Sequence, residues 1–165
     1  MQKEKRTPAR WRYLIFFLVA LSIIGADQLS KAWIRSSLPE GHSLLRLGFL
    51  RITHVHNTGA AFGLLPDQSL MLTIFAIIAG TVVLFFVFYG HRYFLWLEKT
   101  SVILTFGLVL GGTVGNLIDR FRYGYVSDFI DFGFWPAFNV ADSAVTVGVI
   151  LFALILLRHA QTEKQ

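Results

Sequence analysis

The sequence predicts an all-α membrane protein with four transmembrane helices and a small extracytoplasmic β structure. The first observation is composition: 55% of the 165 residues are hydrophobic, only 15% are charged, and the mean hydropathy is +0.58. Soluble domains carry about 45–50% apolar and about 25% charged residues. The second observation is that four long apolar runs recur, and the third is that polar side chains gather near their ends. A chain of this length suits one domain, residues 1–165.

The four predicted spans lie at about 12–34, 68–90, 99–118 and 138–157. Each is close to the roughly 20 residues that a bilayer core requires. Five basic residues at the start of the chain, followed by the uncharged run 13–26, also match a cleaved signal peptide. We favour a span, because the apolar character continues to Ile34. Asp27 and Lys31 within it are spaced i, i+4, so they share a helix face and can pair.

Residues 43–62 predict a small amphipathic sheet on the outer surface, because β-branched and aromatic residues precede the turn signal at Asn57 to Gly59. His54 and His56 fall on one strand face and raise a metal hypothesis. Without a third ligand or an HExxH motif, exposed strand histidines are favoured and no metal site is expected. The absence of cysteine excludes disulfides, a thiol nucleophile and cysteine-based metal sites.

The distribution of lysine and arginine predicts the orientation. Nine of the 15 lie at the two termini and in the loop 91–99, and six lie in the segments on the other side of the predicted membrane. This bias favours both termini in the cytoplasm. The net charge of +5 does not indicate a nucleic-acid partner, because the basic residues form no single stripe.

The predicted topology brings polar residues of three spans to one level. At about 1.5 Å per helical residue, Asp27 lies about 22 Å, Asn116 about 25 Å and Asp142 about 24 Å above the inner edge. These depths predict one shared site near the outer face. In the third span, Gly107, Gly111, Gly112 and Gly115 form small-xxx-small steps that indicate close helix packing, which would also bring Asn116 near its neighbours.

Carboxylates are the candidate chemical groups. Asp119, Asp128, Asp131 and Asp142 lie within 24 positions, and the chain has no G-x-S-x-G motif and no glycine-rich phosphate loop. Ionisable groups at a membrane mark a functional site by default. Two carboxylates held together share a proton, so that one can activate water as a base while the other donates a proton as an acid.

Local charge compensation selects among the four aspartates. Arg120 follows Asp119 and could compensate it, whereas Asp128 and Asp142 lack a near cation and are expected to have raised pKa values. Asp131 is the reserve candidate. A structural role as helix caps is the alternative, since Asn139 precedes Asp142 by three positions. Two other classes of protein remain open at this point: an ion-coupled transporter and a structural lipid-binding membrane protein.

Five ordered motifs carry a resemblance to a known family: DQLSK at 27–31, NTGAAF at 57–62, GGTVGNLIDR at 111–120, VSDFIDF at 126–132 and FNVADS at 138–143. The chain resembles the lipoprotein signal peptidases (signal peptidase II), which are bacterial membrane aspartyl proteases. The resemblance covers nearly the whole chain. It implies four transmembrane helices, an outer β-cradle and a short outer segment before the fourth helix. It also implies cleavage of diacylglyceryl-modified prolipoproteins just before the lipidated cysteine.

The resemblance also implies site residues. Asp128 and Asp142 match the catalytic pair. Eight further residues match family positions that bind the substrate or support the site: Asn57, Gly59, Asn116, Arg120, Asn139, Asp27, Lys31 and Asp119. We therefore expect a peptidase that needs no cofactor and acts as a monomer. Its partners would be a lipidated prolipoprotein and membrane lipids, with no nucleic acid. Its expected location is the bacterial inner membrane, with several spans, both termini in the cytoplasm and the site near the outer face.

Overall fold

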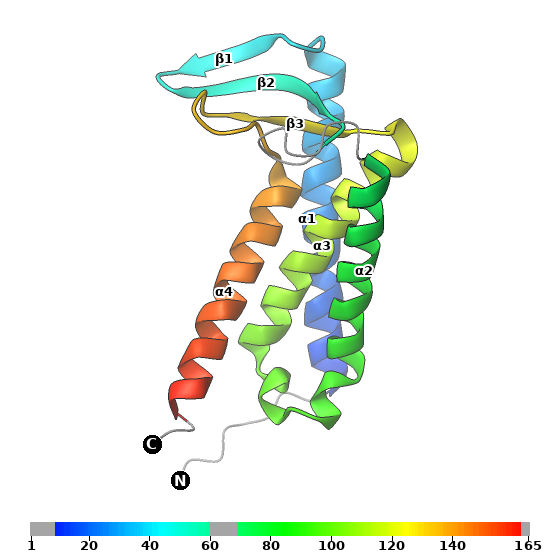
Figure 1. The fold of residues 1–165 in the computed structure, drawn as a ribbon, viewed down its shortest axis with the longest axis vertical. Helices are drawn as coiled ribbons and strands as arrows, with labels where there is room; N and C mark the ends of the chain where they lie inside the picture. Colours follow the sequence, from blue (N-terminus) through cyan, green and yellow to red (C-terminus); the bar gives the residue numbers. More distant parts are fainter. Residues whose placement is uncertain (1–8, 60–68, 163–165) are drawn as a thin grey trace.

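Four long helices stand side by side and a small sheet lies across one end of them (Figure 1). The computed structural model describes residues 9–59 and 69–162. In chain order the elements are α1 (Ala9–Ser37), β1 (Ser43–Leu47), β2 (Leu50–Asn57), α2 (Ser69–Phe88), the 3₁₀ turns η2 (Gly90–Arg92) and η3 (Leu95–Glu98), α3 (Thr100–Tyr123), β3 (Val126–Asp131) and α4 (Val140–Thr162). The first residues of α1 and the last of α4 lie at the end opposite the sheet.

All four helices are long and apolar enough to cross a membrane, which confirms the predicted fold class. Their bounds differ from the predicted spans at the ends. The helix α1 begins three residues earlier and ends three later, and α3 continues five residues beyond Ile118 to Tyr123. Gly124, with φ 80°, ends α3 in a left-handed cap. Asp119 and Arg120 therefore lie on the helix, not in the loop where the sequence placed them.

The helix α3 is the centre of the bundle. In its most apolar stretch 61% of the residues are buried, against 17% in the corresponding stretch of each of the other three helices. The helix packs on α1, α2 and α4. Its glycines allow this. A Cβ at Gly111 would lie 2.8 Å from the carbonyl oxygen of Ala20 on α1, and one at Gly112 would collide with Ala141 on α4. The predicted close packing of the third span is confirmed.

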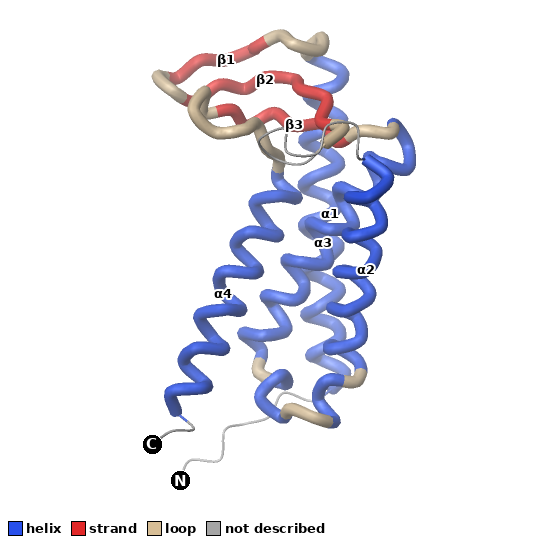
Figure 2. Tube along the Cα trace, in the orientation of Figure 1, coloured by secondary structure: helices blue, strands red, loops and turns tan. Residues whose placement is uncertain are grey.

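The sheet joins two distant parts of the chain (Figure 2). The antiparallel hairpin β1–β2 lies within the predicted segment 43–62, of which residues 60–62 fall outside the described part. β3 pairs antiparallel with β2, placing Val55 opposite Asp128 and Asn57 opposite Val126. This third strand was not predicted from the sequence. It brings Asp128 next to the end of β2.

The prediction of exposed strand histidines is wrong. His54 is 5% exposed, and its Nδ1 donates to the carbonyl oxygen of Leu38 at 2.8 Å. His56 is partly buried; its Nδ1 lies 3.0 Å from Glu40 Oε2, and its ring stacks on Tyr125 with centroids 3.7 Å apart. Burial lowers the pKa of His56. The groups that contact the two rings, Leu38 and Tyr125, lie outside β2, so the short alternation of the strand could not show that the histidines are covered.

Candidate active site

Asp128 lies on β3 and is 1% exposed. Its Oδ2 accepts a hydrogen bond from Asn57 Nδ2 at 2.8 Å, and its Oδ1 accepts one from Asn139 Nδ2 at 2.6 Å. Burial, helped by the negative charge of nearby Asp142 and opposed by the two hydrogen bonds, raises the pKa of Asp128 to about 7. A carboxyl group with this pKa exchanges its proton near neutral pH.

Asp142 lies in the first turn of α4 and is partly exposed. Its Oδ1 accepts from Asn116 Nδ2 at 2.7 Å, and its Oδ2 accepts from the backbone nitrogen of Asn139 at 3.3 Å. The backbone nitrogen of Asp142 donates in return to Asn139 Oδ1 at 2.9 Å. This exchange is a capping box, which fixes the start of α4. The capping role and membership of the polar cluster therefore belong to the same residue.

Asn139 connects the two aspartates, because its side-chain amide donates to Asp128 while its backbone and side-chain oxygen engage Asp142. It is fully buried. Its amide also lies 3.1 Å from Asn116 Oδ1, so the two asparagines bond to each other as well as to the two acids. Asp128 and Asp142, 14 positions apart, become neighbours through this one side chain.

A fully buried ion cluster lies behind the two aspartates. Lys31 Nζ is 2.8 Å from Asp27 Oδ2, 3.3 Å from Asp119 Oδ2 and 2.8 Å from Asn116 Oδ1. The i, i+4 pairing of Asp27 and Lys31 is confirmed. Asp27, Asn116 and Asp142, which the sequence placed at one depth, belong to one cluster. Lys31 links Asp27 to Asn116, and Asn116 contacts Asp142.

Arg120 is not the ion-pair partner of Asp119 that the sequence suggested, and its charge acts more strongly on Asp142 and Asp128 than on Asp119. Asp119 is fully buried between Lys31 and Arg35, with Arg35 Nη1 3.4 Å from its Oδ1. Its Oδ2 also accepts from the backbone nitrogen of Ser127 at 3.0 Å, which ties α3 to β3 beside Asp128. Successive residues on a helix point in different directions, so Arg120 faces another space.

That space is a cavity of about 970 Å³ between α2, α3 and α4. Its polar wall contains Asn57, Gly59, Asn116, Arg120 and Asp142. Apolar residues of the three helices and of the segment 132–138 form the remaining walls. Of the two central acids only Asp142 lines the cavity, whereas Asp128 lies behind Asn57. The backbone nitrogen of Gly59 donates to Asn57 Oδ1 at 3.0 Å, which turns the Asn57 amide toward Asp128.

Three supporting residues were not selected from the sequence. Gln28 Nε2 lies 3.1 Å from Asp27 Oδ2, 3.0 Å from the carbonyl oxygen of Gly115 and 3.2 Å from Asp119 Oδ1. Arg35 Nη1 donates to Ser127 Oγ at 3.0 Å. Gln28 and Arg35 are three residues before and four after Lys31, so helical periodicity could have found both. No local pattern indicates Ser127.

Asp131 stands apart from this cluster. It lies 2.7 Å from Arg51 on the neighbouring strand and accepts a hydrogen bond from the backbone nitrogen of Gly133 at 2.6 Å. An offset of three residues along a strand places Asp131 and Asp128 on opposite faces. Within residues 9–59 and 69–162, no group of three or more His, Asp or Glu side chains is arranged to hold a metal ion.

The fold and these contacts define a membrane protein of four spanning helices in which an asparagine links two acids by hydrogen bonds at one end of the bundle. A family model described as signal peptidase (SPase) II matches residues 19–158. The chain belongs to the signal peptidase II family, whose members are membrane aspartyl proteases that remove signal peptides from prolipoproteins.

Individual relatives agree with this assignment. A lipoprotein signal peptidase of Dehalococcoides mccartyi is 44% identical over 146 residues, which cover 88% of this chain and 91% of the relative. One from Syntrophomonas wolfei is 43% identical over 148 residues, covering 88% of this chain and 94% of the relative. A solved structure described as a bacterial membrane enzyme at 2.3 Å resolution superposes with a TM-score of 0.79 and 33% identity, over 91% of this chain and 92% of the other.

Proposed function

We propose that Asp128 and Asp142 are the catalytic pair with which this protease cleaves diacylglyceryl-modified prolipoproteins just before the lipidated cysteine. The observation that carries the proposal is the bridge through Asn139, which links Asp142 in the polar wall of the cavity to Asp128 directly behind that wall. Paired carboxyl groups of unequal environment supply a base and an acid without a covalent intermediate.

The surroundings favour a division of the two roles. Asp142 lies at the positive end of the α4 dipole, which stabilises a carboxylate. Lys31 donates to the oxygen of the Asn116 amide, so the NH₂ of that amide points to Asp142. We therefore assign the negative charge to Asp142 and the shared proton to Asp128, whose pKa is raised to about 7, chiefly by burial.

In this scheme Asp142 takes a proton from a water molecule as the water oxygen attacks the scissile carbonyl carbon. Asp128 donates its proton to the carbonyl oxygen as the tetrahedral intermediate forms. When the carbon–nitrogen bond breaks, Asp142 returns its proton to the leaving nitrogen of the cysteine. The acid form of Asp128 is restored from the hydroxyl group of the intermediate.

The remaining site residues divide into two groups. Asn57, Gly59 and Arg120 line the cavity and are proposed to bind the substrate backbone near the scissile bond. Residues that hold the pair in place are Asn116, Asn139, Asp27, Lys31 and Asp119. The apolar walls of the same cavity suit a substrate that stays in lipid while its peptide bond meets water.

We further propose that both termini face the cytoplasm and that the sheet and the site lie at the outer face of the inner membrane. The excess of basic residues at the opposite end of the bundle supports this orientation. We also propose that the enzyme acts as a monomer and needs neither nucleic acid nor a cofactor. EDTA is expected to leave turnover unchanged.

Cleavage of a diacylglyceryl precursor by the purified protein tests the proposal. Asp128→Asn and Asp142→Asn should each lower turnover by at least about 10²-fold, the scale of general acid–base catalysis. Asp131→Asn, on the other face of the strand, is the matched control and should retain turnover. An unlipidated precursor should be a poor substrate. Near-normal turnover by either variant of the pair would disprove the assignment.

A further inference from the structure

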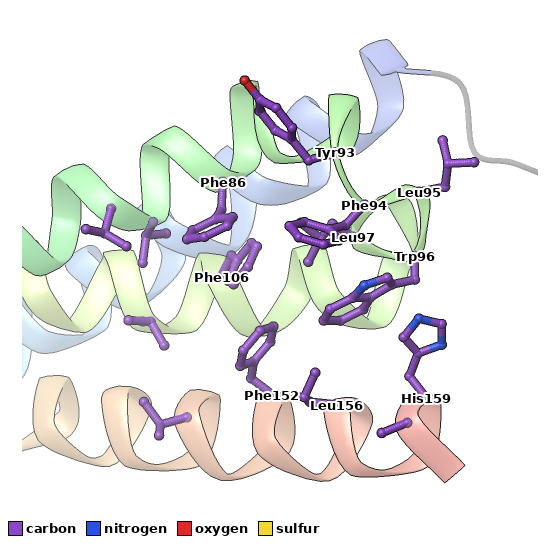
Figure 3. Close-up of a pocket in the computed structure, with 15 residues that line it drawn as sticks. Phe86, Tyr93, Phe94, Leu95, Trp96, Leu97, Phe106, Phe152, Leu156 and His159 are labelled. Carbon is purple, nitrogen blue, oxygen red and sulfur yellow. The ribbon is translucent and has the colours of Figure 1, made fainter. Parts of the chain in front are cut away.

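A second cavity, of about 870 Å³, lies between α2, α3 and α4 toward the end of the bundle opposite the sheet. The proposed chemistry does not use it. Figure 3 shows the rings of Phe86 on α2, Phe106 on α3 and Phe152 on α4 directed into the space between the helices. Trp96 stacks on Phe152 with centroids 6.0 Å apart and lies 5.0 Å from the ring of His159, near the terminal end of α4. We name this space the lower cavity.

The lower cavity continues the cavity of the site along the same helix faces. On α2, residues Leu72, Ala76 and Ala79 line the site cavity and Val83 and Phe86 line the lower one. On α3 the corresponding residues are Arg120, Asn116 and Thr113, followed by Val109 and Phe106. Steps of three and four residues keep each row on one face of its helix. The two cavities therefore follow one another along the same faces of α2 and α3, opposite α4, and we call the two together the groove.

The groove has the length of the apolar segment of a signal peptide. From Leu72 to Phe86 it extends 14 residues, or about 21 Å. The apolar region of a signal peptide has about 7–15 residues, which cover about 10–22 Å as a helix. Such a segment must be helical in lipid, because its backbone groups find no other partners there. An apolar helix in a groove of side chains is a common mode of peptide recognition.

We infer that the lower cavity seats the N-terminal part of the substrate's apolar signal segment, so that the groove aligns the scissile bond with the two aspartates. This inference rests on the proposed function. The signal segment lies on one side of the scissile bond and the acylated cysteine on the other. A helix held along the whole groove would set which peptide bond reaches Asp142.

A matched pair of substitutions on α4 tests the inference. Val149 lines the lower cavity and is 52% exposed, whereas Ile150 is 53% exposed and is not part of its lining. Two lipidated precursors are compared, one with its full apolar segment and one in which only the residues next to the cleavage site remain. Val149→Trp should lower the ratio of kcat/KM between the long and the short precursor about tenfold, the scale of steric exclusion from an apolar pocket. Ile150→Trp should leave that ratio as in the wild type.

A binding measurement removes the dependence on how the tryptophan variants fold. A benzophenone amino acid is placed at position 149 or 150 of the Asp128→Asn variant, in vesicles of phosphatidylethanolamine and phosphatidylglycerol with the long precursor. Light should produce a covalent adduct with the precursor at position 149 and little at 150. Equal adducts at both positions, or adducts with phospholipid alone at 149, would overturn the inference. It would also be overturned if both tryptophan variants lowered the ratio equally or neither did.

The outcomes separate this inference from the proposed function. If the wild type cleaves the precursor and the aspartate variants do not, the catalytic pair stands whatever happens at position 149. If an aspartate variant retains turnover, the catalytic assignment fails while the crosslink still reports where the signal segment lies.

Discussion

The carboxylate of Asp27 on α1 accepts a hydrogen bond at 3.0 Å from the backbone nitrogen of Ala141 on α4. A helix start leaves its first amide groups without intrahelical partners, and here a buried side chain from another helix satisfies one of them. The next residue along the chain is Asp142. The other oxygen of Asp27 lies 2.8 Å from Lys31 Nζ. One carboxylate on α1 therefore both positions the start of α4 and neutralises the buried cation.

Asp27→Ala should destabilise the protein strongly, because it leaves the Lys31 ammonium buried with less compensation and removes a cap from α4. Breaking a buried pair by removing one partner costs about 3–5 kcal/mol. Asp131→Ala is the control, since its partner Arg51 has a side chain that is 38% exposed. That loss should be within about 1 kcal/mol. Denaturant titration in detergent micelles measures both free energies of unfolding, and equal losses would contradict the structural role of Asp27.

Gly115→Ala should also disturb Asp27, because it adds a methyl group on α3 that meets the carboxylate. A Cβ at Gly115 would lie 2.6 Å from Asp27 Oδ2, and this carboxylate is fully buried and held by Lys31 and the backbone nitrogen of Ala141. Overpacking of this kind costs about 1–3 kcal/mol. Gly25→Ala is the matched control on α1, because nothing lies within 4 Å of its Cβ position. Alanine there should stabilise the helix by about 0.5–1 kcal/mol. The prediction fails if thermal unfolding shows the same change for both variants.

The main features of the fold could be predicted from the sequence because they depend on local patterns. Four apolar runs of sufficient length predict four helices. The lack of a near cation, which singled out Asp128 and Asp142 in the sequence, does not hold in the fold, because the charges of Lys31 and Arg120 reach both acids. Features that depend on long-range contacts could not be predicted. Arg120 adjoins Asp119 in sequence, yet the actual partners, Lys31 and Arg35, lie 88 and 84 positions earlier, on α1.

The third strand shows the same limit. β3 carries Asp128 and Asp131 within six residues, and its partner β2 lies about 70 positions earlier. Strand pairing at that separation leaves no periodic signal in either segment. The burial of His54 could not be predicted for the same reason, since the carbonyl oxygen that accepts its hydrogen bond belongs to Leu38, just beyond the end of α1.

Turnover should decline as the pH rises through about 7. The pKa of Asp128 is raised to about 7, chiefly by burial, so below this pH the group is protonated and can act as the acid. Above it the proton is lost, the pair carries two negative charges, and kcat/KM should fall. The profile of kcat/KM between pH 5 and 9, with a lipidated precursor as substrate, measures this limb.

Asn57→Ala should move that alkaline limb. Asn57 donates to Asp128 Oδ2 at 2.8 Å and thereby lowers the pKa of Asp128 relative to burial alone. Without the amide the pKa should rise, and the limb should lie at a pH about one unit higher, the scale of one hydrogen bond to a carboxylate. The maximal rate should also fall because Asn57 lines the cavity. An unchanged limb with a lower rate would mean that Asp128 is not the titrating acid.

Single cysteines test the orientation, because the natural chain has none and each introduced thiol is a unique label site. Ser43 on β1 and Gln161 on the last turn of α4 are both exposed and lie at opposite ends of the bundle. In spheroplasts, whose inner membrane is intact, a membrane-impermeant maleimide should label Ser43→Cys and not Gln161→Cys. After permeabilisation both should react, which controls for thiol accessibility. The opposite pattern would place the sheet and the aspartate pair on the cytoplasmic side and so exclude the proposed topology. An exported substrate could not reach a cavity on that side.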